Sequence, residues 1–291
     1  MLRVGSRDSK LALAQTDIVI AELKDGFPHG QYEVIKIKTK GDKILDKSLS
    51  KVGGKGLFVK EIEEALLLGN IDFAVHSMKD MPYELPEGLE ISAITEREDP
   101  RDVLISANGM KFMDLRAGAL IGTSSLRRVC QLEVMRPDIR ICPLRGNILT
   151  RIAKMKEQGL DAIVLAAAGI KRLGLEEMIT QYFAVEEMIP AVGQGALAVE
   201  SRSGDKKSSY FKKVHHRDTA IAIKAERSFM KTLGGSCKIA IGAFAKISGE
   251  TMDIIGMLEK DGEIKRGHIS GSVFDGEKMG IQLAENLGEI S

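Results

Sequence analysis

The chain contains no tryptophan, and aromatic residues make up only 4% of its 291 residues. This scarcity disfavours proteins that stack nucleic-acid bases on aromatic side chains. Its three cysteines, Cys130, Cys142 and Cys237, form no C-x-x-C pair, which argues against a zinc site or a disulfide framework and fits a reducing cytosol. No apolar run of spanning length and no signal peptide are evident, so we expect a cytoplasmic protein with no membrane partner.

Common catalytic motifs are missing as well. The sequence has no G-x-G-x-x-G after a predicted strand, no phosphate-binding G-x-x-x-x-G-K-[ST], no H-E-x-x-H and no G-x-S-x-G. The formal net charge is only +1, so a protein that binds nucleic acid over a whole face is not expected. No set of residues has the spacing of a metal site.

The charge is distributed unevenly along the chain. Between Ile121 and Arg172, ten lysines and arginines stand against four acids, so this segment carries +6 and the rest of the chain −5. Seven of the ten are arginines, which bind carboxylates through paired hydrogen bonds. A local basic field in a neutral protein predicts a small anionic ligand. The alternative is a solvated helix surface.

Hydrophobic periodicity predicts an α/β protein with an internal repeat. Val4-Gly5-Ser6-Arg7 is echoed by Ile121-Gly122-Thr123-Ser124, and residues 69–75 are echoed by 159–164. Each segment ends a short strand at a Gly, Ser or Thr junction before a helix, which favours two similar lobes with a cleft between them. Ser9 is expected to cap the first helix. The residues expected on its buried face are Leu11, Ala14, Ile18 and Ala21.

A strand near Val199 complicates the domain order. If it returns to the first lobe, that lobe is discontinuous, with domain 1 at residues 1–95 and 192–214 and domain 2 at 100–189. The polar run 96–102 is the expected linker. Residues 217–291 are predicted to form a smaller α+β domain with three strands, hairpin turns at 248–249 and 261–262, and a closing helix.

Two residues are candidates for chemistry. Cys237 follows Gly234-Gly235-Ser236 and precedes Lys238, a cation that favours the reactive thiolate, so it is a candidate covalent anchor. The alternative is a small buried residue that opens a strand. Asp80 follows Lys79 just after a buried strand, where a fixed carboxylate can stabilise a developing cation and exchange protons. The alternative is an ordinary turn aspartate.

Seven motifs, in the same order along residues 1–245, resemble the porphobilinogen deaminase (hydroxymethylbilane synthase) family. They are residues 5–7 with 11–15, and residues 53–58, 74–82, 122–128, 144–147, 190–198 and 234–237. The resemblance implies a transferase of tetrapyrrole and heme biosynthesis that condenses four porphobilinogen molecules head to tail into hydroxymethylbilane, releasing ammonia each time. It also implies lobes like those of type II periplasmic binding proteins, and a dipyrromethane cofactor joined to Cys237 through a thioether.

The resemblance further implies roles for single residues. Asp80 is the expected catalytic residue, and the loop at 45–55 is the expected lid. Each pyrrole carries an acetate and a propionate, which cationic side chains would bind. The expected cofactor-binding residues are Cys237, Lys79, Ser125, Arg127, Arg128, Arg145 and Gly146. The expected substrate-binding residues are Arg7, Ser9, Thr123, Arg151, Arg172 and Gln194.

The main rival is a non-catalytic, two-lobed protein that binds an anion. Such a protein would share the lobes and the positively charged helix ends, but it would give Cys237 no purpose. A DNA-binding regulator fits less well, because no basic recognition helix is evident. We expect a monomer whose only partner is the small-molecule substrate porphobilinogen.

Intact mass spectrometry tests the covalent anchor. The purified protein should be heavier than its sequence mass by one dipyrrole unit, because the thioether survives purification. The Cys237→Ser variant should have its sequence mass, since it lacks the sulfur. An unmodified mass for the wild-type protein would contradict the anchor.

Overall fold

The computed structural model describes residues 1–43, 59–205, 207–235 and 239–289. The chain divides into two compact units. Unit 1 comprises Met1–Glu98 and Ala196–Ala220, and unit 2 comprises Asp99–Gly195 and Ile221–Ser291. Among the helices of the described ranges, none combines the length and the apolar character needed to cross a membrane.

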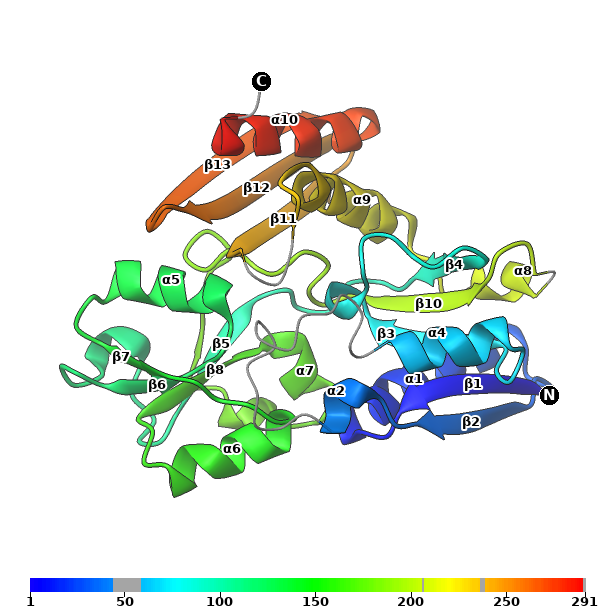
Figure 1. The fold of residues 1–291 in the computed structure, drawn as a ribbon, viewed down its shortest axis with the longest axis horizontal. Helices are drawn as coiled ribbons and strands as arrows, with labels where there is room; N and C mark the ends of the chain where they lie inside the picture. The colour runs from blue at the N-terminus through cyan, green and yellow to red at the C-terminus, as the bar shows by residue number, and fades with distance from the viewer. Residues whose placement is uncertain (44–58, 206, 236–238, 290–291) are drawn as a thin grey trace. The chain divides into compact units, whose positions relative to one another are not determined.

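Unit 1 is built on a five-stranded sheet in the order β2-β1-β3-β10-β4 (Figure 1). Its strands are β1 (Leu2–Arg7), β2 (Tyr32–Ile37), β3 (Phe73–Ser77), β4 (Leu89–Ile94) and β10 (Leu197–Arg202). Strand β1 pairs in parallel with β2 and β3, whereas β10 runs antiparallel between β3 and β4. The strand expected near Val199 therefore does pair with the first sheet.

Helices α1 (Lys10–Gly26) and α4 (Lys60–Leu67) cover opposite faces of this sheet. Val19 of α1 packs in one apolar cluster with Val75, while Ile62 of α4 packs in another with Ala74. Neighbouring residues of a strand point to opposite faces, so these two clusters lie on the two sides of β3. The unit also contains the short helices α2 (Lys40–Lys43) and α8 (Ser208–Phe211) and the 3₁₀ helix η1 (Met78–Asp80).

The predicted start of α1 is confirmed, but its predicted buried face is not. The Ser9 hydroxyl accepts a hydrogen bond from the Ala12 N–H over 3.2 Å, which confirms the cap. The helix buries Gln15 and Thr16 in place of the face that begins at Leu11. Gln15 donates to Ser77 Oγ and Thr16 to the Ala12 carbonyl, and a buried polar group that is hydrogen-bonded costs little. The predicted face was therefore wrong, because the helix also buries the apolar residues Ala12, Val19, Ile20 and Leu23.

Unit 2 contains a second five-stranded sheet, in the order β7-β6-β8-β5-β9. Its strands are β5 (Asp102–Ser106), β6 (Leu120–Gly122), β7 (Arg140–Cys142), β8 (Ala162–Ala166) and β9 (Gln181–Tyr182). Strand β6 pairs in parallel with β7 and β8, whereas β5 runs antiparallel to β8 and β9. Its helices are α5 (Leu126–Met135), α6 (Ile148–Glu157) and α7 (Ala167–Lys171), with 3₁₀ helices η2 (Phe112–Asp114) and η3 (Glu176–Met178).

The two large sheets share one plan, which confirms the predicted repeat. In each, one strand (β1 or β6) lies between two parallel partners, and the fourth position is filled by an antiparallel strand (β10 or β5). Gly5 and Gly122 hold matching places. A Cβ atom would lie 2.3 Å from Ile71 Cδ1 at Gly5 and 2.7 Å from Leu160 Cδ1 at Gly122. The predicted cleft between the lobes remains a prediction.

The third sheet is antiparallel, in the order β11-β12-β13, and lies within unit 2. Its strands are β11 (Ile241–Ser248), β12 (Thr251–Lys260) and β13 (Glu263–Ser272), joined by tight turns with positive φ at Gly249 and at Asp261-Gly262. Helix α10 (Gly276–Gly288), which follows η4 (Val273–Asp275), lies along β12 and β13 (Figure 1). Phe229 of α9 (Arg217–Thr232) packs in the same core. The α/β class with a smaller α+β part is confirmed, and the three-domain boundaries stay a prediction.

Adding a methyl group at either glycine of the repeat tests this packing. Gly5→Ala and Gly122→Ala should each lower the free energy of unfolding by about 1–3 kcal/mol, because a Cβ atom would collide with buried aliphatic side chains. Urea denaturation followed by circular dichroism measures the loss. Ala107→Ser, which adds one atom at an exposed position, is the control and should leave the midpoint unchanged. An unchanged midpoint in both glycine variants would contradict the proposed close packing.

Candidate active site

In unit 1 the predicted site residues follow two parallel strands. Arg7 and Ser9 come at the end of β1, and Lys79 and Asp80 come after β3 in η1. Because β1 and β3 are parallel neighbours, their carboxyl ends meet at one edge of the sheet. This edge is where ligands bind in open α/β sheets. The structure therefore brings these four residues to one edge, with Ser9 engaged as the cap of α1.

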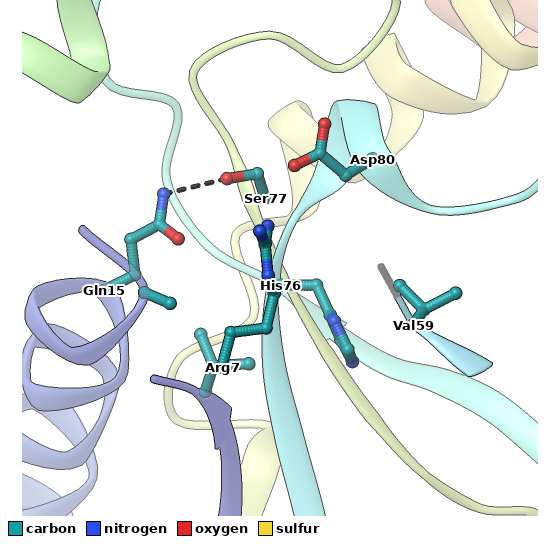
Figure 2. A pocket seen from close by; sticks show the side chains of 8 residues that line it. Arg7, Gln15, Val59, His76, Ser77 and Asp80 are labelled. Carbon is teal, nitrogen blue, oxygen red and sulfur yellow. Dashed lines mark hydrogen bonds between the residues drawn. The ribbon is translucent and has the colours of Figure 1, made fainter. Parts of the chain in front are cut away.

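A pocket opens at this edge (Figure 2). It is lined by Arg7, Ala12, Gln15, Val59, Val75, His76, Ser77 and Asp80. Figure 2 shows Gln15 reaching from α1 to Ser77, and its Nε2 donates to Ser77 Oγ over 2.8 Å. Asp80 is exposed and Arg7 is half-buried. A carboxylate and a guanidinium group thus line one small polar pocket.

In unit 2 the predicted residues follow three parallel strands, β6, β7 and β8. Those after β6 are Thr123, Ser125, Arg127 and Arg128, those after β7 are Arg145, Gly146 and Arg151, and Arg172 follows α7 after β8. The carboxyl ends of the three strands again meet at one edge. Five of the seven arginines of the basic segment therefore lie at this edge, whereas Arg136 follows the C-terminal end of α5 and Arg140 is at the amino end of β7.

The turn after β7 is held by its own arginine. Arg151 Nε donates to the Gly146 carbonyl over 2.8 Å, and Gly146 has a φ of 122°, a conformation that favours glycine. Arg172 Nη2 donates to the Gly195 carbonyl over 2.6 Å. These bonds fix the backbone positions from which Arg145, Arg151 and Arg172 extend.

Arg127, Arg128 and Gln194 converge on a carboxylate that the sequence did not suggest. Asp102 is fully buried and lies 2.7 Å from Arg127 Nη1 and 2.7 Å from Arg128 Nη2. Gln194 Nε2 donates to Asp102 Oδ1 over 3.0 Å. Burial alone would raise the pKa of Asp102, but the two guanidinium groups outweigh it and hold the pKa well below its usual range.

A second buried cluster lies beside the unit 1 pocket. His76 Nε2 is 3.0 Å from Glu200 Oε2, and both side chains are almost completely buried. Glu63 of α4 is buried next to them. Burial, and then the nearby Glu200 carboxylate, raise the pKa of Glu63 to about 7. Two carboxyl groups and an imidazole are therefore buried together in one cluster.

Sequence reasoning missed three parts of these sites. Asp102, the last residue of the predicted linker, is the first residue of β5. Its charge can be buried there because Arg127 pairs with it, which the sequence did not indicate. Gln15 and Ser77 stand within the motifs but were given no role. The pairing of His76 with Glu200 joins residues 124 positions apart, so no local pattern could have indicated it.

Two predicted features lie outside the described residues. They are the anchor Cys237 and the lid expected at 45–55.

Comparison with known proteins decides the family. Residues 2–210 match the family model described as "Porphobilinogen deaminase, dipyromethane cofactor binding domain", and residues 220–289 match its C-terminal domain. The chain belongs to the porphobilinogen deaminase family. It is 50% identical over 288 residues to a porphobilinogen deaminase of Clostridium acetobutylicum, which covers 99% of each chain. It is 51% identical over 284 residues to one of Clostridium botulinum strain Loch Maree, which covers 98% of each.

Solved structures give a weaker likeness. A nutrient-binding protein from Burkholderia cenocepacia bound to methionine aligns with a TM-score of 0.45 and 14% identity, over 74% of this chain and 90% of that one. A YaeC-family lipoprotein from Enterococcus faecalis aligns with a TM-score of 0.42, over 79% of this chain and 95% of that one. Likenesses this weak carry no argument about function.

Membership of the porphobilinogen deaminase family settles the broad activity. The chain is a transferase of tetrapyrrole biosynthesis, it acts on a small molecule, and its cofactor is dipyrromethane. The rival interpretation, a non-catalytic anion-binding protein, is not favoured, because relatives matched over nearly the whole chain are enzymes.

The arginines at the edge of the second sheet suit a cofactor rich in carboxylates. Arg145, Arg151 and Arg172 are half-buried, which leaves part of each side chain accessible. A guanidinium group presents its N–H donors in a planar fork that matches the two oxygens of a carboxylate. The roles of the individual residues remain predictions.

The buried Glu63 predicts a pH dependence of stability. Its pKa is raised from 4.5 to about 7 on folding, so the folded protein holds this proton more tightly than the unfolded chain does. The free energy of unfolding should therefore fall as the pH rises from about 4.5 to about 7, and then level off. Glu63→Gln should lose this part of the slope in urea denaturation across that range.

Glu87→Gln is the control, because Glu87 is exposed and is not among the groups that shift the pKa of Glu63. This variant should keep the wild-type slope. Equal slopes in wild-type and Glu63→Gln protein would contradict the assignment.

Proposed function

We propose that Asp80 is the catalytic residue with which this chain condenses four porphobilinogen molecules head to tail into hydroxymethylbilane. One observation carries the proposal: Asp80 and Arg7 line the same pocket at the carboxyl ends of β3 and β1. A guanidinium group beside a carboxylate suits a substrate that has acidic side chains and develops positive charge during the reaction.

Asp80 would act in two steps of the reaction. As the C–N bond of porphobilinogen breaks, its electron pair leaves with ammonia and positive charge spreads over the pyrrole. A fixed carboxylate near that ring can stabilise the charge by about 3 kcal/mol. When the new C–C bond has formed, the ring carbon of the growing chain that made the attack gives up its proton, the C–H bonding pair returns to that ring, and Asp80 is the first acceptor of the proton.

The cationic residues would balance the acidic side chains of the growing product. Every condensation adds one acetate and one propionate, so the number of carboxylates rises by two at each step. We assign Arg7, Arg151 and Arg172 to the substrate and the growing chain. Ser9, Thr123 and Gln194 are assigned to the same set. Paired N–H donors make arginine suited to this binding.

The cofactor would be held by a second set. When bound, dipyrromethane supplies the primer that is extended, and we propose that Cys237 attaches it through a thioether. Arg127 and Arg128, positioned by Asp102, would bind its carboxylates. Lys79, Ser125, Arg145 and Gly146 complete this set.

We further propose that the protein acts as a monomer in the cytoplasm, with domain 1 at 1–95 and 192–214, domain 2 at 100–189 and domain 3 at 217–291. One observation supports the compartment: the cysteine spacing fits a reducing environment.

Asp80→Asn tests the catalytic role. The amide keeps the size of the side chain but removes its charge, so kcat for product formation should fall by about 10²–10³-fold. The cofactor mass should remain, because Asp80 is assigned no part in holding it. Glu87→Gln, which removes an exposed carboxylate downstream in the chain, is the control and should keep wild-type turnover. Near-normal turnover of Asp80→Asn would overturn the proposal.

A further inference from the structure

The third sheet is packed against α5 through contacts that the proposed function does not use. All of them lie within unit 2. Ile189 packs in one apolar cluster with Met257 of β12, and the partly buried Cys130 of α5 joins this cluster. The Ala243 N–H of β11 donates to the Pro190 carbonyl over 3.0 Å. The backbone at residues 189–190 therefore lies between the third sheet and the helix that carries the arginine pair.

The guanidinium group of Arg127 is held from two sides. Its Nη1 lies 2.7 Å from Asp102 Oδ2 and donates to the Ile189 carbonyl over 2.6 Å. Only 6% of the side chain is exposed, so these two oxygens decide which way its planar fork of N–H groups points. A residue that fixes the Ile189 carbonyl therefore also fixes the direction of this guanidinium group.

Gln131, one turn further along α5, fixes that carbonyl. Its Oε1 accepts from the Ile189 N–H over 2.8 Å, and its Nε2 donates to the Ile189 carbonyl over 3.3 Å and to the Arg127 carbonyl over 2.9 Å. Arg266 Nη2 of β13 donates to the same Oε1 over 3.3 Å. Because arginine can only donate, the amide oxygen must face it. One buried amide thus joins α5, β13 and the backbone at Ile189.

Gly242 of β11 lies directly against Arg127. It is buried, and a Cβ atom there would lie 3.1 Å from Arg127 Cδ, 3.0 Å from the Ile189 carbonyl oxygen and 2.9 Å from the Pro190 carbonyl oxygen. Contacts this close would force either the backbone or the arginine to shift. The missing side chain at this position therefore leaves the space in which Arg127 lies.

We propose that Gln131 and Gly242 are positioning residues, which aim the guanidinium group of Arg127 at the cofactor carboxylates and so fix the primer that each condensation extends. The inference rests on the proposed role of Arg127 in binding dipyrromethane. Because the growing chain is attached to this primer, a small displacement of the primer carboxylates also moves the reacting carbon of the terminal ring. Catalysis would then depend on the third sheet through Arg127 as well as on the proposed thioether.

Gln131→Met is the first test. Methionine has roughly the size of glutamine but makes none of these hydrogen bonds, so the Ile189 carbonyl is no longer fixed. The kcat per molecule that carries the dipyrrole mass should fall by about 10-fold. KM should stay near its wild-type value, because the substrate carboxylates are assigned to other arginines. Intact mass spectrometry gives the loaded fraction, and initial rates over a range of porphobilinogen concentrations give kcat and KM.

Gly242→Ala is the second test, and it removes no hydrogen-bond donor or acceptor. The added methyl group presses on Arg127, so kcat should again fall by about 10-fold at unchanged KM. Gly267→Ala is the matched control. It adds the same methyl group in β13, 2.8 Å from Leu283 Cδ1 rather than against Arg127. This control should lower the thermal midpoint and keep the wild-type kcat.

The outcomes separate a positioning role from a purely structural one. A folded Gln131→Met or Gly242→Ala protein without the dipyrrole mass would support the proposal, provided that Gly267→Ala carries that mass. An equal loss of kcat in Gly267→Ala would trace the effect to stability and refute the proposal.

Arg127→Gln separates this inference from the proposed function. Wild-type turnover of that variant would contradict the cofactor role of Arg127 itself. A slow Arg127→Gln protein beside normal kcat in both Gln131→Met and Gly242→Ala would overturn this inference alone.

Discussion

One buried carboxylate anchors the basic segment of unit 2 to its sheet. Asp102 opens β5, and it faces Arg127 and Arg128 of α5 and the Gln194 amide with no exposure to solvent. A buried charge is tolerated only when it is fully paired, and removing one partner of such a pair typically costs about 3–5 kcal/mol. The pairing therefore fixes where α5 lies on its sheet. The junctions after β6, β7 and β8, from which the other arginines extend, are built around the same sheet.

The sheet of unit 1 has the same strand arrangement as the five-stranded sheet of unit 2, but different side chains lie at its edge. Its sheet has the same order of strand directions, and its site residues again follow the carboxyl ends of parallel strands. Here, though, the pocket contains a carboxylate, a guanidinium group, an imidazole and two neutral polar side chains. One unit thus offers mainly positive charge for binding anions, and the other offers groups that can exchange protons. The same scaffold therefore presents different side chains in the two units.

Much of this was accessible from the sequence, because most elements carry a local signal. Alternation and glycine junctions located the strands, Ser9 identified the start of α1, and turn residues located the hairpins of the third sheet. The sequence did not indicate that two polar residues, Asp102 and Gln15, are buried. Asp102 was predicted to end a polar linker, and Gln15 was not among the residues of the predicted buried face of α1. Both are buried because a partner distant in sequence satisfies them, as Gln194 and Ser77 do here. Such pairings become visible only when the chain has folded.

The placement of β10 has a consequence for how the protein is made. This strand lies between β3 and β4, so the first sheet stays incomplete until residues 197–202 have been synthesised. The second sheet needs only residues 102–182, all of which leave the ribosome earlier. Since domains tend to fold as they emerge, the sheet formed by residues 102–182 is expected to form before the sheet of unit 1. Until then, β3 exposes an unpaired edge, which makes the nascent chain most prone to aggregation just before β10 emerges.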